Sequence, residues 1–96
     1  MKEREYILEL YETYNKLLTD KERTYFEYYY FEDYSLQEIA DNNKVSRAYV
    51  GKYINVIEKK LTKFENALNL IDKSKKIKEI IVDLDEKTKE KIEDLL

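Results

Sequence analysis

Apolar side chains recur every three or four positions along most of the chain, which is the period of an amphipathic helix. Residues 4–18 follow this pattern and predict a first helix, with apolar positions at Ile7, Leu10, Tyr11, Tyr14, Leu17 and Leu18. Thr19-Asp20-Lys21-Glu22 then has the form of a capping box, in which a Thr and a Glu three residues later satisfy the first amides of a helix. We therefore expect a second helix directly after Thr19.

The second stretch carries six aromatic side chains between residues 25 and 31, a density that would also suit a β-strand. We predict a helix because the capping box precedes the cluster, and because no turn or partner strand follows it. All ten tyrosines lie before residue 54, so the core of the first half should be rich in aromatic rings. An aromatic platform for RNA is the alternative role of this cluster, and core packing is the role we expect.

Ser35-Leu36-Gln37-Glu38 forms a second capping box and predicts a short helix that ends near Asn42. Asn42-Asn43-Lys44 would make a turn, and Ser46 would cap the next helix. That helix begins a long unbroken apolar stripe, made of Val50, Ile54, Ile57, Leu61, Phe64, Leu68 and Ile71. After Lys73-Ser74 we expect another helical segment, with Ile77, Ile80, Ile81 and Leu84, and then a last one capped by Asp85, with Ile92, Leu95 and Leu96.

The two helices around this turn have the pattern of a helix-turn-helix, from about Ser35 to Ile57. The small core between its crossed helices would contain Ala40, at the closest approach, with Ile39, Val45, Val50 and Ile54. Lys44 occupies the turn position usually held by Gly or Asn, and a positive φ there would cost about 1 kcal/mol. Gly51, inside the second helix, costs roughly 1 kcal/mol against Ala. Close approach of a partner or neutral drift would explain that glycine.

The length and composition of the chain favour one all-α domain. Its 96 residues include one Gly and no Pro, residues on which hairpins and extended turns depend. We divide this single domain, 1–96, into a helix-turn-helix core (1–63) and a C-terminal helical extension (64–96). The division lies where aromatic residues stop, apart from Phe64, and Lys and Glu begin to dominate.

The absence of Cys and His removes the usual zinc ligands and the common nucleophile–base pairs. No Gly-rich loop is present to hold a phosphate group. A hard cation would have to bind carboxylates, yet no loop spacing supports such a site among Glu32, Asp33, Glu38 and Asp41. We therefore predict that the protein is not an enzyme and has no cofactor, no metal site and no small-molecule substrate.

No apolar run approaches the ~18 residues of a membrane span. Met1 is followed by Lys2-Glu3-Arg4-Glu5, with no apolar region of a secretory signal behind it. Without Cys, disulfides are impossible, which fits a reducing compartment. These features together predict a cytoplasmic protein with no membrane span.

Charge is unevenly distributed, although the net charge is only −3. Residues 19–43 hold two basic and seven acidic side chains, whereas residues 44–63 hold six basic and one acidic. The positive segment contains the second helix of the helix-turn-helix, where phosphates would lie. Arg47 could pair with guanine and Lys52 with a phosphate, while we expect Lys59, Lys60 and Lys63 to form a solvated face. One of Tyr49 and Tyr53 should face the core.

At this point the sequence resembles region 4 of bacterial sigma factors, and more closely the YlxM family of helix-turn-helix proteins from low-GC Gram-positive bacteria and mycoplasmas. The resemblance covers about residues 6–70. The shared segments are Leu17-Leu18-Thr19-Asp20-Lys21, Tyr28-Tyr29-Tyr30, Glu32-Asp33-Tyr34-Ser35-Leu36, Glu38-Ile39-Ala40-Asp41 and Val45-Ser46-Arg47.

The resemblance implies a DNA-binding regulatory protein. It also implies a part in the signal recognition particle (SRP) secretion pathway, because the family's genes usually neighbour those of the SRP GTPases. The helix-turn-helix pattern, carried over by resemblance, makes Ser46, Arg47, Ala48, Lys52 and Asn55 face the groove or the phosphates. With Lys44 of the turn, these are the residues that we predict to bind nucleic acid. The alternative is an accessory protein that binds or modulates an SRP GTPase without binding DNA.

The apolar positions of the C-terminal extension require a cover. They either fold back on the first helix or pair with a second chain. Helix-turn-helix proteins often dimerise to read two half-sites, so we expect a homodimer.

Overall fold

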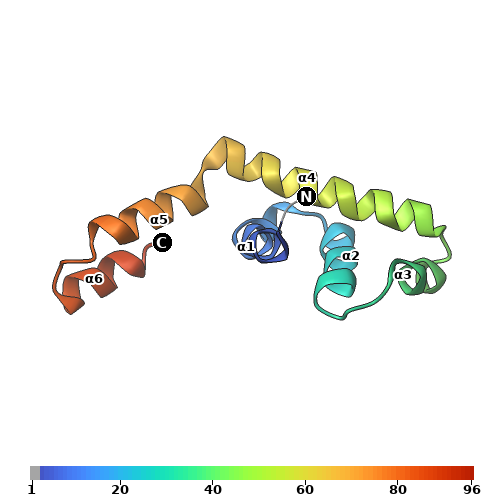
Figure 1. Ribbon diagram of the computed structural model, residues 1–96, viewed down its shortest axis with the longest axis horizontal. Coiled ribbons are helices and arrows are strands. Elements are labelled where there is room, and N and C mark those ends of the chain that lie inside the picture. Colours follow the sequence, from blue (N-terminus) through green and yellow to red (C-terminus); the bar gives the residue numbers. More distant parts are fainter. Residues whose placement is uncertain (1–2) are drawn as a thin grey trace.

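The computed structural model describes residues 3–96, which contain six α-helices, one 3₁₀ helix and no strand. Their bounds are α1 Arg4–Tyr14, η1 Asn15–Leu17, α2 Asp20–Tyr30, α3 Leu36–Asn43, α4 Arg47–Leu68, α5 Leu70–Ile80 and α6 Glu86–Glu93. The all-α class is thus confirmed, and the aromatic stretch 25–31 is helical up to Tyr30. In Figure 1 the long helix α4 runs above α1, α2 and α3, and α5 and α6 extend from its far end as an arm, giving dimensions of 54 × 24 × 23 Å.

One core joins α1, α2, α3 and α4. Aromatic rings fill its centre, as the sequence predicts: Tyr11 stacks on Phe26 with ring centroids 4.1 Å apart, and Phe26 stacks on Tyr30 at 4.4 Å. One side of α4 covers these rings. Its buried row consists of Val50, Ile54, Ile57 and Leu61.

Both predicted capping boxes are present and start α2 and α3. The Glu22 amide donates to Thr19 Oγ1 at 3.1 Å, and the Thr19 amide donates back to Glu22 Oε1 at 2.8 Å. The Ser35–Glu38 pair has the same arrangement, with distances of 3.0 and 2.9 Å. The predicted caps Ser46 and Asp85 also accept from backbone amides of the helices that follow them.

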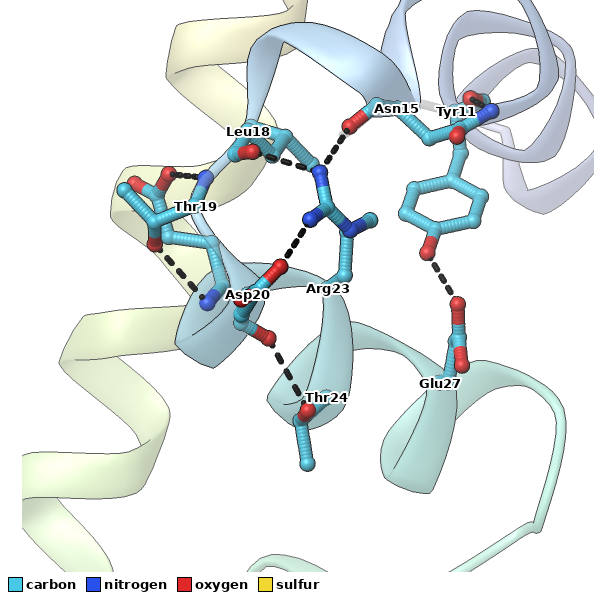
Figure 2. A network of polar contacts seen from close by, with 9 residues as sticks. Tyr11, Asn15, Leu18, Thr19, Asp20, Arg23, Thr24 and Glu27 are labelled. Carbon is cyan, nitrogen blue, oxygen red and sulfur yellow. Dashed lines mark hydrogen bonds and ion pairs between the residues drawn. The ribbon is translucent and has the colours of Figure 1, made fainter.

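The first helix is shorter than predicted, because α1 ends at Tyr14 and continues only as the 3₁₀ turn η1. Figure 2 shows how Arg23 holds the following turn: its Nη1 donates to the carbonyls of Asn15 (3.0 Å) and Leu18 (2.6 Å), and its Nη2 pairs with Asp20. One guanidinium of α2 thus binds two carbonyls of the connection between α1 and α2, and this ties α2 to that connection; the Asn15 carbonyl also accepts from the Leu18 amide.

The helix-turn-helix has the small core that the sequence predicts. Ile39, Ala40 and Val50 are fully buried, Ile54 is nearly so, and Val45 is half-buried. A Cβ added to Gly51 would lie 3.6 Å from Leu36 Cδ1 of α3, which is ordinary van der Waals contact. Crowding within the chain therefore does not require a glycine at this position.

The break between α4 and α5 lies at Asn69, earlier than the Lys73-Ser74 position that the sequence suggested. Asn69 has a φ of 55° and no side-chain cap. The cap is supplied by Glu65, a buried carboxylate that accepts from the amides of Ile71 (3.1 Å) and Asp72 (3.2 Å) and from the Tyr14 hydroxyl. Tyr14 Oη in turn accepts from the Leu70 amide at 3.2 Å. This Glu65–Tyr14 clamp joins α1, α4 and the arm.

Only the base of the arm folds back on α1. Ile71 joins the main core, and Lys75 pairs with Glu9 at 3.5 Å. Farther out Ile81 is buried, but several large apolar side chains remain exposed: Ile80, Val82, Leu84, Leu95 and Leu96. None of the helices described in residues 3–96 is long and apolar enough to cross a bilayer.

The Glu65–Tyr14 clamp should contribute measurably to stability. We expect Glu65→Ala to lower the free energy of unfolding by about 2–3 kcal/mol, because it leaves buried donors without an acceptor. Tyr14→Phe, which removes only the hydroxyl, should cost about 1 kcal/mol. Urea denaturation measures both. Glu12→Ala, on an exposed part of α1, is the control and should stay within about 0.5 kcal/mol of the parent; equal effects of Glu65→Ala and Glu12→Ala would contradict the clamp.

The clamp also predicts a pH dependence. Burial raises the pKa of Glu65, but the Tyr14 hydroxyl and the amides of Ile71 and Asp72 outweigh it and leave that pKa below its ordinary value of 4.5. Below about pH 4.5 the unfolded chain therefore binds more protons than the folded one, so stability present above this pH is lost as the pH falls. Glu65→Gln should flatten the stability profile between about pH 3 and pH 7. A profile as steep as that of the parent would refute this assignment.

Gly51→Ala should stabilise the protein, because Ala gains about 1 kcal/mol of helix propensity and its methyl group meets Leu36 without a clash. The melting temperature should rise by roughly 4–8 °C for a domain of this size. A lower melting temperature would show that this crossing is tighter than the 3.6 Å separation implies.

Candidate nucleic-acid interface

The turn between α3 and α4 contains Lys44 and leads directly into the N-cap of α4 at Ser46. Lys44 adopts the left-handed conformation, with φ 55° and ψ 44°. The amides of Lys44 and Val45 both donate to the Ala40 carbonyl and so cap the C-terminal end of α3. A lysine in this conformation costs about 1 kcal/mol against glycine, so Lys44 carries a conformational cost that its own contacts do not explain.

The side of α4 opposite its buried row forms an exposed stripe. Its members follow one another at intervals of four, three, four and four residues, so they share one face of the helix. We call this the outer stripe; it consists of Ala48, Lys52, Asn55, Lys59 and Lys63. Because the opposite face of α4 is buried, the lysines of the outer stripe are exposed to solvent.

All six residues predicted to bind nucleic acid lie exposed at the turn or on the leading half of α4. Ser46 is the N-cap, and its Oγ accepts from the Tyr49 amide at 3.0 Å. Ala48, Lys52 and Asn55 follow on the outer stripe. Within the described residues, Lys44, Arg47 and Lys52 have no carboxylate within 4.0 Å. These three cations are therefore exposed near the start of α4 and have no acid partner among the described residues.

Lys60 does not share the environment of Lys59 and Lys63, and the prediction that it would lie on a solvated face was wrong. Its Nζ lies 3.0 Å from Glu22 Oε1, which forms an ion pair between α4 and α2. Burial raises the pKa of Glu22, but the Thr19 amide and Lys60 outweigh it and bring the pKa below its ordinary value. Lys60 therefore links α4 to α2, whereas Lys59 and Lys63 remain exposed as expected.

Of the two tyrosines in the first turns of α4, Tyr53 faces the core, and its ring lies 4.8 Å from that of Tyr25. The prediction that one of the pair would do so is confirmed. Tyr49 keeps 39% of its surface exposed and accepts a hydrogen bond from Lys21 of α2 at 3.0 Å. Sequence reasoning missed Lys21, because only the packing of α2 against α4 brings it to this end of the molecule.

A groove lies beside the outer stripe of α4 and shares Asn55 with it. Tyr30, Leu36 and Gly51 line it together with Arg4, Asn55 and Glu58. The Tyr30 hydroxyl donates to Glu58, and Arg4 donates to the Tyr30 carbonyl, so these three lining residues are bonded to one another. Within residues 3–96, no group of three acidic side chains is placed to hold a metal ion.

Comparison with known proteins identifies relatives of the whole chain. Residues 1–95 match the UPF0122 family, described as "Putative helix-turn-helix protein, YlxM / p13 like". A UPF0122 protein of Clostridium botulinum (strain Alaska E43 / Type E3) is 40% identical over 91 residues, covering 95% of this chain and 84% of the relative. One of Clostridium acetobutylicum is 37% identical over 97 residues (98% and 84%), and one of Ureaplasma urealyticum serovar 10 is 39% identical over 71 residues (74% and 72%).

These matches extend the resemblance seen in residues 6–70 through the arm. The family's description as helix-turn-helix agrees with the all-α fold of the described residues, in which α3 and α4 are joined by a short turn at Lys44. The chain therefore belongs to the UPF0122 family of YlxM / p13-like helix-turn-helix proteins.

Proposed function

We propose that the protein is a DNA-binding regulator that reads duplex DNA with the leading half of α4. The observation that carries the proposal is the group of three exposed cations at Lys44, Arg47 and Lys52, none of which has a carboxylate partner among the described residues. Unpaired cations on one end of a recognition helix are what phosphate neutralisation requires.

The geometry suggests a role for each residue. In a helix-turn-helix, the first turns of the second helix enter the major groove. Arg47 would then donate two hydrogen bonds to guanine, and the methyl group of Ala48 would contact a thymine methyl. Asn55, farther along the outer stripe, would meet a base edge or a phosphate. Lys44, Ser46 and Lys52 would contact phosphates on either side, which fixes the register of the helix on the duplex.

The net charge of −3 does not oppose this assignment, because the charge is segregated. The segment 44–63 holds six basic residues and one acidic residue, and its one acid, Glu58, accepts from Tyr30. Electrostatic steering of a polyanion depends on the local charge rather than on the net charge of the chain, and the segment 44–63 is basic.

A second candidate function is supported by the arm. Its side chains Ile80, Val82 and Leu95 are exposed, and a protein partner would cover such apolar side chains. The resemblance to the YlxM family points to an SRP GTPase as that partner, which the protein would bind or modulate without DNA. A second copy of the chain would also cover the arm, and such a homodimer would present two recognition helices.

Substitutions at the start of α4 separate the two functions. Duplexes are first selected from a random DNA pool, and binding is then measured by fluorescence anisotropy. We expect Arg47→Ala to weaken binding by about 1–3 kcal/mol and to relax the sequence preference. Lys52→Ala should weaken binding to all sequences and reduce the salt slope of log K by about 0.9.

Lys78→Ala, on the arm, is the matched control for the loss of one positive charge, because Lys78 is exposed and far along the chain from α4's start. Lys78→Ala should leave the set of enriched duplexes unchanged. Failure to enrich any duplex, together with capture of an SRP GTPase from extract, would reject the DNA proposal and support the second function. Light scattering of the same samples reports whether the protein is a dimer.

A further inference from the structure

Lys21, in the first turn of α2, is held above a cluster of tyrosine rings. Its Nζ lies 5.2 Å from the ring centroid of Tyr53, 5.5 Å from that of Tyr49 and 5.8 Å from that of Tyr25. It also donates to Tyr49 Oη at 3.0 Å. The hydrogen bond to Tyr49 is the main reason why the pKa of Lys21 is raised, so the ammonium stays charged. Aromatic faces attract a cation without neutralising it.

The acids beside Lys21 in sequence are engaged elsewhere. Asp20 pairs with Arg23, as Figure 2 shows, and Glu22 pairs with Lys60 at 3.0 Å. No carboxylate in residues 3–96 lies within 4.0 Å of Lys21. The cluster therefore presents a fixed positive charge that the rest of the described chain leaves uncompensated.

The position of this charge is informative. The N-terminal end of a helix carries the positive end of the helix dipole, which repels a cation in the first turn. The dipole of α2 therefore does not stabilise the charge of Lys21. It lies instead against the first turns of α4, through Tyr49 and Tyr53. Tyr49 and Lys52 are three residues apart on α4, which makes them neighbours on its surface. The charge of Lys21 thus borders the start of the outer stripe, on a different helix.

We propose that Lys21 is a backbone contact for duplex DNA, meeting a phosphate beside the groove that α4 enters. Tyr49 is its positioning residue, because its hydroxyl and ring hold the ammonium before the duplex arrives and so reduce the ordering cost of binding. The inference rests on the proposed function. It adds a contact from α2, so that two helices hold the same stretch of duplex.

The test compares the salt dependence of binding for four variants with that of the parent. Binding of one labelled duplex, selected by the parent protein, is followed by anisotropy between about 50 and 200 mM salt. Lys21→Gln should weaken binding and reduce the slope of log K against log salt by about 0.9. Lys87→Gln, in exposed α6, removes the same charge far along the chain and should leave the slope unchanged.

Two further variants separate contact from structure. Lys21→Arg keeps a cation that stacks on tyrosine, so the slope should return to that of the parent. Tyr49→Phe keeps the ring and removes the acceptor, so binding should weaken less than in Lys21→Gln. Melting temperatures close to that of the parent exclude unfolding as the cause in every variant.

The outcomes distinguish the two proposals. If the parent binds and Arg47→Ala weakens binding, but Lys21→Gln matches Lys87→Gln, then the proposed function stands and the role of Lys21 is rejected. If the parent binds no duplex in a salt-dependent way, both proposals fall. A slope reduced by Lys21→Gln and restored by Lys21→Arg supports the contact.

Discussion

Burial of one side of α4 is the constraint on which the rest of the molecule depends. Val50, Ile54, Ile57 and Leu61 lie against α1, α2 and α3, and burial of each such side chain stabilises the fold by roughly 1.5–3 kcal/mol. Rotation of α4 about its axis would expose this buried row to water and is therefore unfavourable. The opposite face, which carries the outer stripe, consequently stays directed to solvent. The hydrophobic core therefore determines the orientation of the outer stripe, although no residue of that stripe belongs to the core.

Features that depend on local chemistry could be predicted from the sequence. A capping box needs only four consecutive residues, and both Thr19–Glu22 and Ser35–Glu38 start helices as predicted. The buried row of α4 follows from helical periodicity. Exposure of Arg47 and Lys52 follows in turn, because a periodic buried row and a known cap fix the face and the first turn of the helix.

Features that depend on tertiary packing could not be predicted. Sequence gave no reason to separate Lys60 from Lys59 and Lys63, since only the crossing of α2 and α4 brings Glu22 within 3.0 Å of Lys60. The end of α4 was misplaced for a related reason. Asn69 adopts a left-handed conformation that Asn tolerates, and its helix is capped by Glu65 and Tyr14, which are 51 residues apart in sequence. Neither residue has the spacing of a local cap.

Tertiary packing also explains why the net charge describes this surface poorly, because it decides which cations have an acid partner. Among the described residues, Glu22 neutralises Lys60, and Asp20 neutralises Arg23. Lys21 lies between these two acids in sequence yet pairs with neither, because tyrosine rings hold it instead. A cation that is fixed in place and lacks an acid has given up conformational entropy without gaining an ion pair. Lys21 is such a residue, and it contacts the first turns of α4 through Tyr49 and Tyr53, where, under the proposed function, the duplex would supply the missing charge.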